Sequence, residues 1–254
     1  MSATAALADV PVAILAGGLA RRLGAVTRAM PKALVEVAGR PFIDHQLRLL
    51  ARRGARRVVL CLGHLGEPVR DHVGDGRAFG LEVAYSFDGD ALLGTGGALK
   101  RAEPLLGRAA FFVTYGDSYL DVSLRAVLDA FDASGLLGLM TVLRNDGRWD
   151  RSNVRFDAGI LRAYDKRHPT PDMAHIDYGL AVLHTDALAR IAVGQPYDLA
   201  DLYGMLVAQG LMGGFEVRHR FYEIGSPQGL EETRAFLEGE EAASPERDAE
   251  GRGR

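Results

Sequence analysis

Short apolar runs alternate along the chain with stretches in which apolar residues recur at helical spacing. The first run, residues 12–15, is followed at once by a glycine turn, which predicts a strand that opens into a loop. Further strands are predicted at residues 58–62, 81–85 and 111–114, and helices at residues 41–53, 67–73 and 96–103. Strands that alternate with helices predict a mostly parallel sheet with helices on both faces, whose ligands bind at the carboxyl ends of strands.

The second half of the chain has a less regular pattern. Strands are predicted at residues 138–143, 154–156, 160–164 and 180–183, some of them antiparallel, with a helix at residues 199–209 and a last strand region at residues 215–217. No repeat is visible that would predict a carboxyl-terminal β-helix. The predicted fold class is therefore α/β, with a Rossmann-like mixed, mostly parallel sheet flanked by helices.

Composition fits one globular domain. The chain has 254 residues, of which 48% are hydrophobic and 25% charged, so it can bury a sizeable core. We predict that the domain covers residues 1–238. Residues 239–254 are rich in Glu, Ala, Arg and Gly and hold no large apolar side chain, which predicts a disordered tail because burial cannot offset the entropy of ordering.

The charge distribution and the single cysteine indicate which binding partners and which cellular compartment to expect. The formal net charge is −3 and the basic residues are dispersed, so no electrostatic footprint for nucleic acid is visible. The single cysteine, Cys61, lies in an apolar run, which is typical of a reducing compartment. No stretch approaches the roughly 20 apolar residues of a membrane span, and we expect a cytoplasmic protein.

The loop after the first predicted strand has the chemistry of a phosphate site. Gly17 and Gly18 let backbone amides approach a phosphate, and Arg21 and Arg22 supply positive charge, although glycines can also serve only to turn the chain. The loop matches neither the dinucleotide fingerprint nor the Walker pattern. Pro31 restrains the backbone just before Lys32, and the lysine side chain can reach back over the same phosphates.

Taken together, residues 15–41 resemble the signature of the sugar nucleotidyltransferases, L-A-G-G-x-G-x-R-L followed by P-K-x-L-x-x-x-x-x-x-P. The resemblance implies a GT-A-like nucleotidyltransferase fold and two catalytic cations, Arg22 and Lys32, that stabilise charge as a sugar phosphate attacks the α-phosphorus of an NTP. Ala20 stands where the family usually has glycine. The implied nucleotide-binding residues of this loop are Leu15, Ala16, Gly17 and Gly18.

A second glycine cluster, residues 93–99, opens a predicted helix. Alone it would be an ordinary helix start. It is similar to the family's second glycine motif, which lies against the nucleobase and ribose, and this resemblance implies that Thr95, Gly96 and Gly97 bind nucleotide.

Two carboxylates are candidates for binding magnesium. Asp117 follows the predicted strand 111–114, at a position where an aspartate can also merely cap a turn. The resemblance places it on the family's Gly-Asp pair, which binds Mg²⁺, a cation that prefers oxygen ligands. Glu223 stands in Y-E-I-G-S where the family usually has D-x-G-T, and it is the implied second ligand.

Two further segments resemble the family's sugar-side motifs. Lys166 matches the lysine of an E-K pair that contacts the sugar phosphate, with Asp165 in place of the glutamate, and it could equally be a solvated strand end. Asp177, Tyr178 and Gly179 match an N-x-G segment that contacts the sugar, with an aspartate in place of the asparagine.

The expected reaction transfers a nucleoside monophosphate from an NTP to a sugar 1-phosphate, with Mg²⁺ as cofactor and pyrophosphate as second product. The chain looks most similar to heptose 1-phosphate guanylyltransferases and N-acetylmuramate 1-phosphate uridylyltransferases, and we favour GTP with a heptose- or hexose-type phosphate. A UTP-dependent uridylyltransferase, a CTP:phosphocholine-type cytidylyltransferase and a non-catalytic nucleotide-sugar binder stay open. No feature indicates an oligomeric state.

Overall fold

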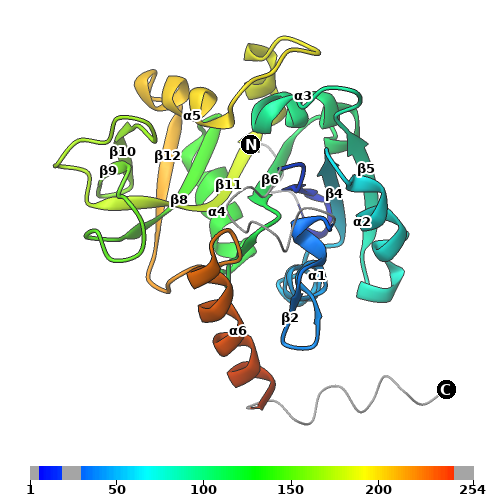
Figure 1. Ribbon diagram of the computed structural model, residues 1–254. Coiled ribbons are helices and arrows are strands. Elements are labelled where there is room, and N and C mark those ends of the chain that lie inside the picture. The colour runs from blue at the N-terminus through cyan, green and yellow to red at the C-terminus, as the bar shows by residue number, and fades with distance from the viewer. Residues whose placement is uncertain (1–5, 19–29, 243–254) are drawn as a thin grey trace.

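The computed structural model describes residues 6–18 and 30–242. Within these residues, one nine-stranded sheet has the order β5-β4-β1-β6-β11-β8-β12-β10-β9 (Figure 1). Its strands are β1 (Val12–Leu15), β4 (Arg57–Leu62), β5 (Glu82–Phe87), β6 (Ala110–Tyr115), β8 (Gly138–Arg144), β9 (Val154–Asp157), β10 (Ile160–Tyr164), β11 (His175–His184) and β12 (Met212–Val217). Strand directions within the sheet differ between its two halves.

The amino-terminal half is parallel. Strand β1 pairs in parallel with both β4 and β6, and β4 pairs in parallel with β5. In the other half, β11 runs antiparallel to β6 and β8, and β10 runs antiparallel to β9 and β12, whereas β8 and β12 are parallel. The predicted mixed sheet with Rossmann-like character is thus confirmed.

Helices cover both faces of the sheet (Figure 1). They are α1 (Phe42–Arg52), α2 (Gly66–Val73), α3 (Gly94–Leu106), α4 (Leu124–Ser134), α5 (Leu199–Ala208) and α6 (Pro227–Ala242). Strand β1 shows the layering: Val12 and Ile14 join one core cluster with α1, α2 and α4, while Ala13 and Leu15 join a second cluster with α3 and α5. Successive strand residues point to opposite faces, so a strand buried on both faces is apolar throughout.

Local sequence explains where the helices of the second half begin. Ser123 caps α4 by accepting a hydrogen bond from the Ala126 amide at 3.2 Å, and Asp198 caps α5 by accepting one from the Ala200 amide at 3.0 Å. The sequence analysis did not predict α4 or α6. No helix in the described part of the chain is long and apolar enough to cross a membrane.

Helix α6 extends away from the sheet (Figure 1), and its Leu237 joins a small core cluster with residues of α1 and of the strand segments near residues 37 and 119. Phe236 stacks on Tyr222 with ring centroids 4.0 Å apart. The helix continues through Gly239 to Ala242, so the predicted tail boundary at residue 239 falls within a helix, because aromatic packing anchors the turns before it. Residues 243–254 lie outside the described residues.

Two pairs of short strands complete the fold. They are β2 (Glu36–Val37) with β3 (Arg40–Pro41), and β7 (Ser118–Tyr119) with β13 (Tyr222–Glu223). The second pair sets Glu223 opposite Ser118. It thereby links the loop after β6 to the start of α6, two segments that are far apart in the sequence.

Candidate active site

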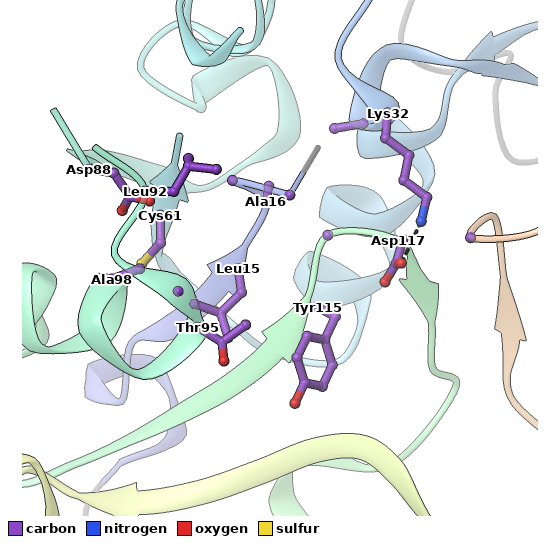
Figure 2. Close-up of a pocket in the computed structure, with 16 residues that line it drawn as sticks. Leu15, Ala16, Lys32, Cys61, Asp88, Leu92, Thr95, Ala98, Tyr115 and Asp117 are labelled. Atoms are coloured by element: carbon purple, nitrogen blue, oxygen red, sulfur yellow. Dashed lines mark hydrogen bonds and ion pairs between the residues drawn. The ribbon is translucent and has the colours of Figure 1, made fainter. Parts of the chain in front are cut away.

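A cavity of about 420 Å³ opens at the carboxyl ends of β1, β4 and β6, where parallel strands typically place a ligand (Figure 2). Lys32, Asp88 and Asp117 are its charged lining residues. The full lining consists of Leu15, Ala16, Gly17, Gly18, Lys32, Ala33, Cys61, Asp88, Leu92, Gly94, Thr95, Ala98, Tyr115, Gly116, Asp117 and Gly225.

Lys32 and Asp117 form an ion pair on one side of this cavity (Figure 2). The distance from Lys32 Nζ to Asp117 Oδ2 is 2.6 Å, and the two side chains are 15% and 29% exposed. Pro31 has an extended backbone just before the short 3-10 helix Lys32–Leu34, and this directs the lysine toward the end of β6. The sequence prediction that these two residues share one site is consistent with this geometry.

The loop that carries Asp117 is held by backbone hydrogen bonds and by a buried glutamine. Gln46, on α1 and 3% exposed, donates from Nε2 to the carbonyl oxygens of Tyr115 at 2.8 Å and Ser118 at 2.9 Å. The Ile224 amide donates to the Asp117 carbonyl at 2.9 Å. The sequence analysis missed Gln46, whose signal was a polar residue among the core positions of a helix.

Glu223 holds the first turn of α6. Its carboxylate accepts hydrogen bonds from the Gly225 amide and from Ser226 Oγ, the latter at 2.6 Å. Ser226 Oγ in turn accepts from the Gly229 amide at 2.9 Å. Glu223 therefore stabilises the start of α6, because the amino-terminal end of a helix interacts favourably with a negative charge.

Lys32, Asp117 and Glu223 converge on Gly225. A Cβ atom at Gly225 would lie 3.0 Å from Lys32 Nζ and 3.3 Å from Asp117 Oδ2, and it would be in still closer contact with Glu223 Oε2. The glycine is needed because any side chain would fill the space between these charged groups.

The same arrangement suits a magnesium ion shared with substrate. Among the described residues, no group of three or more His, Cys, Asp or Glu side chains could hold a metal by itself. Mg²⁺ is usually held by only one or two carboxylates together with substrate phosphates and waters. Asp117 and Glu223, two carboxylates that meet at Gly225 on the cavity wall, fit that pattern.

The predicted phosphate loop lies at the cavity as far as it is described. Leu15, Ala16, Gly17 and Gly18 all line it. A Cβ at Gly17 would come within 2.9 Å of the Gly63 amide nitrogen, so this position requires glycine for the close approach of two backbones. Ala20, Arg21 and Arg22 lie outside the described residues.

The second glycine motif divides between the cavity and the protein interior. Gly94 and Thr95 line the cavity, whereas the amides of Gly96 and Gly97 donate to the Tyr197 carbonyl at 2.9 and 3.2 Å. A Cβ at Gly97 would lie 2.7 Å from the Gln195 carbonyl oxygen. These two glycines, which we predicted to bind nucleotide, allow α3 to pack closely on residues 195–199.

Of the predicted sugar-side residues, Lys166 follows β10, whereas Asp177, Tyr178 and Gly179 lie on β11. Burial raises the pKa of Asp177. A hydrogen bond of 3.0 Å donated by the Gly179 amide and the charge of neighbouring Lys166 act in the opposite direction and lower this pKa. Lys166 Nζ lies 5.8 Å from the ring centroid of Tyr115, a cavity residue. Tyr178 is 2% exposed and packs in the core against Phe221, because adjacent strand residues point to opposite faces.

Another part of the cavity carries a carboxylate that the sequence analysis did not select. Asp88 is 7% exposed and accepts a hydrogen bond from the Leu93 amide at 3.2 Å. It lies with Leu92, Cys61 and Ala98, away from Lys32 and Asp117 (Figure 2). Its signal in the sequence was an aspartate directly after a strand, in the same kind of position as Asp117.

Comparison with known proteins identifies the family. Residues 12–150 match the nucleotidyl transferase family model, so the chain belongs to this family and the predicted resemblance is confirmed. The chain is 30% identical over 200 residues to a glucose-1-phosphate cytidylyltransferase of Salmonella typhimurium, covering 70% of this chain and 76% of that protein. It is 30% identical over 225 residues to an N-acetylmuramate alpha-1-phosphate uridylyltransferase of Caulobacter vibrioides, covering 85% and 91%.

Some relatives are much longer. The match to a UTP–glucose-1-phosphate uridylyltransferase of Synechocystis, 26% identical, covers 78% of this chain but only 55% of that protein. Among solved structures, HddC from Yersinia pseudotuberculosis complexed with GMP-PN superimposes with a TM-score of 0.74 at 21% identity, covering 90% of this chain and 99% of HddC. This likeness confirms the predicted fold class.

Replacement of Gly225 by alanine tests whether the charged groups around it act together. The added Cβ would meet the side-chain ends of Glu223, Lys32 and Asp117 rather than backbone, so the charged groups should be displaced and the hydrogen bonds of Glu223 at the start of α6 weakened. We expect kcat/KM for pyrophosphate release to fall about 100-fold, because displacements near 1 Å have such effects.

The matched control is Gly239→Ala on α6, where a Cβ meets nothing within 4 Å. It should leave turnover unchanged and raise the thermal stability slightly, because alanine has a higher helix propensity than glycine. Full activity of Gly225→Ala would show that the convergence at this glycine has no catalytic importance.

Proposed function

We propose that this protein transfers a nucleoside monophosphate from an NTP to a sugar 1-phosphate, with release of pyrophosphate. The observation that carries the proposal is the Lys32–Asp117 pair, set in a cavity at the carboxyl ends of parallel strands beside a glycine loop. Relatives named for the transfer of uridylyl and cytidylyl groups to sugar 1-phosphates support the same reaction class.

The chemistry is a direct displacement. An oxygen of the sugar phosphate forms a bond to the α-phosphorus, the bond from that phosphorus to the bridging oxygen breaks, and pyrophosphate leaves with the electron pair. The attacking phosphate is already ionised near neutral pH, since its second pKa is about 6. The protein therefore needs no general base, and no covalent enzyme intermediate forms.

Lys32 stabilises the charge that develops on the phosphate oxygens. Its ammonium group is largely withdrawn from solvent and held in place by Asp117, so it requires little reorganisation as the reaction proceeds. Arg22, outside the described residues, is proposed as a second cation. Mg²⁺, when bound, would be held by Asp117 and Glu223 and would neutralise negative charge on the phosphates.

The acceptor side is assigned to Lys166 and Asp177. Both lie near Tyr115, whose ring borders the cavity. Lys166 is proposed to bind the phosphate of the sugar, and the Asp177 carboxylate and the backbone around Gly179 to bind hydroxyl groups. The proposed substrates are GTP and a heptose- or hexose-type 1-phosphate.

A nucleotide-sugar binding protein without transfer activity is the second candidate. It is favoured by the hydrogen bonds that occupy the Glu223 carboxylate at the start of α6. A pyrophosphate-release assay separates the two functions: the protein is incubated with Mg²⁺, each NTP, and either a panel of sugar 1-phosphates or phosphocholine. Nucleotide binding without pyrophosphate release in every combination would support the binder, and release with UTP or with CTP and phosphocholine would support the corresponding alternative.

The Lys32→Met variant removes the ammonium group while keeping most of the side-chain volume. We expect kcat to fall by about 100- to 1000-fold, the usual effect of deleting one group that stabilises transition-state charge. The control is Lys100→Met, because Lys100 pairs with Glu103 on α3 and does not line the cavity. Unchanged turnover in Lys32→Met, with the fold intact by circular dichroism, would contradict the assignment.

Magnesium titrations of Asp117→Asn and Glu223→Gln test the proposed cofactor. Loss of either carboxylate should raise the Mg²⁺ concentration that gives half-maximal activity by at least about tenfold. The exposed Asp129→Asn on α4 serves as control, since Asp129 pairs only with Arg125 among the described residues. If Glu223→Gln keeps the wild-type Mg²⁺ dependence, the second ligand lies elsewhere.

A further inference from the structure

One face of α6 lies against the short strand that carries Glu223. Gly229, Thr233 and Phe236 are spaced by four and three residues along this helix, so they share one of its faces. Strand β13 has only two residues and pairs with β7, which is equally short. An isolated pair of strands is marginally stable at best, so the position of Glu223 depends on the packing of α6.

Thr233 holds the backbone of Glu223. Its Oγ1 atom donates a hydrogen bond of 2.8 Å to the Glu223 carbonyl oxygen, and the residue is 0% exposed. A threonine within a helix often bonds a carbonyl of its own preceding turn, whereas this hydroxyl is directed to a different segment. Removing the hydroxyl would leave a buried carbonyl without its partner on α6.

Gly229, one helical turn before Thr233, leaves room for the side chain of Glu223. A Cβ atom at Gly229 would lie 2.5 Å from the Glu223 Cδ atom and 2.7 Å from its carbonyl oxygen, and it would overlap with Oε1. The carboxylate therefore lies directly on the backbone of α6. Glycine is unfavourable inside a helix, and this close approach explains why the position needs it.

Phe236 packs on the residues next to the proposed metal ligands. Its ring stacks on Tyr222 with centroids 4.0 Å apart and an interplanar angle of 17°, and it meets the Tyr119 ring edge to face at 6.0 Å. Tyr222 and Tyr119 are paired across β13 and β7. The face of α6 thus contacts the residue before Glu223, the backbone of Glu223 and its carboxylate.

A glutamate needs such support more than an aspartate would. Its side chain has one more rotatable bond, and ordering each additional bond costs conformational entropy. Residues that hold a metal ligand in one orientation raise the affinity of the site for its metal. The contacts from α6 restrict Glu223 at both its backbone and its carboxylate.

We propose that Thr233 and Gly229 are positioning residues for Glu223, and that through them α6 sets the affinity of the site for Mg²⁺. Neither residue lines the cavity, so both act through Glu223. This inference rests on the proposed function in taking Glu223 as a magnesium ligand, and it deepens that function by naming residues outside the cavity that support the metal.

The test measures the contribution of magnesium to nucleotide binding without turnover. The dissociation constants of GTP, UTP and CTP are determined by calorimetry without sugar phosphate, once with Mg²⁺ and once with EDTA, and their ratio isolates the effect of the metal. In Thr233→Val, which keeps the shape and removes the hydroxyl, this ratio should fall by at least about tenfold. Thr233→Ser keeps the hydroxyl and should retain the wild-type ratio.

Thr141→Val is the matched control. Thr141, on β8, is also 0% exposed, and its Oγ1 atom donates to the Leu180 carbonyl oxygen at 2.6 Å. It does not line the cavity. Both valine variants lose one buried hydrogen bond and should unfold at a lower temperature, but Thr141→Val should keep the wild-type ratio of dissociation constants.

An unchanged ratio in folded Thr233→Val would overturn the inference. An equal fall in Thr141→Val or in Thr233→Ser would do so too, because general loss of stability or altered packing would then explain the effect. A wild-type ratio near one for all three nucleotides would also overturn it. If Thr233→Val does not fold, Gly229→Ala decides: a ratio at least about tenfold lower supports the inference, and an unchanged ratio overturns it.

Pyrophosphate release, measured separately, distinguishes this inference from the proposed function. Release by the wild type together with an unchanged ratio in Thr233→Val would retain nucleotidyl transfer and remove Thr233 as a positioning residue. Absence of release with every sugar phosphate, together with the expected fall in the ratio, would reject the transfer and leave the role of Thr233 standing.

Discussion

The parallel pairing of β1 with both β4 and β6 is the constraint on which the rest of this structure depends. It aligns Leu15 with Cys61 and with Tyr115, so three strands end at the same edge of the sheet and the loops after them share one cavity. Each loop contributes a different group: backbone from the glycine loop after β1, neutral surface from β4, and a carboxylate from the turn after β6. A slip of one residue in β1 would also exchange its two buried faces.

The charged groups of this cavity are unevenly distributed between its two ends. The Lys32–Asp117 ion pair and the nearby Glu223 concentrate charge at one end, where Gly225 leaves room for phosphates. The other end is apolar except for Asp88. Phosphate oxygens and a nucleobase have this same contrast in polarity, and in the proposed function the phosphates lie at the Lys32 end.

Much of the fold follows from the sequence because strands buried on both faces are short, continuous apolar runs. Every predicted strand is present, and β11 differs most, since the bulge between Asp177 and Ala181 and the polar residues before it break the apolar run. Lys32 and Asp117 could be selected from the sequence, because Lys32 belongs to the Pro-Lys motif and Asp117 stands just after a predicted strand. The α/β class and the family were both predicted correctly.

The remaining features depend on contacts between distant residues. The sequence does not reveal that the amides of Gly96 and Gly97, which we predicted to bind nucleotide, donate to the Tyr197 carbonyl. Tyr178 was predicted to bind the sugar, and the sequence did not reveal that its side chain is 2% exposed. Gln46 and Asp88 carry no local motif, and their surroundings appear only when the cavity and the loop after β6 are seen in three dimensions.

The fate of the α-phosphorus tests the central claim most directly. The protein is incubated with Mg²⁺, a sugar 1-phosphate and GTP labelled at the α-phosphate, and the products are separated. Our account predicts that the label moves into a nucleoside diphosphate sugar, with one pyrophosphate released for each molecule formed and none released without the sugar phosphate. Label that stays in GTP with every sugar phosphate, or that appears only as free GMP, would contradict it.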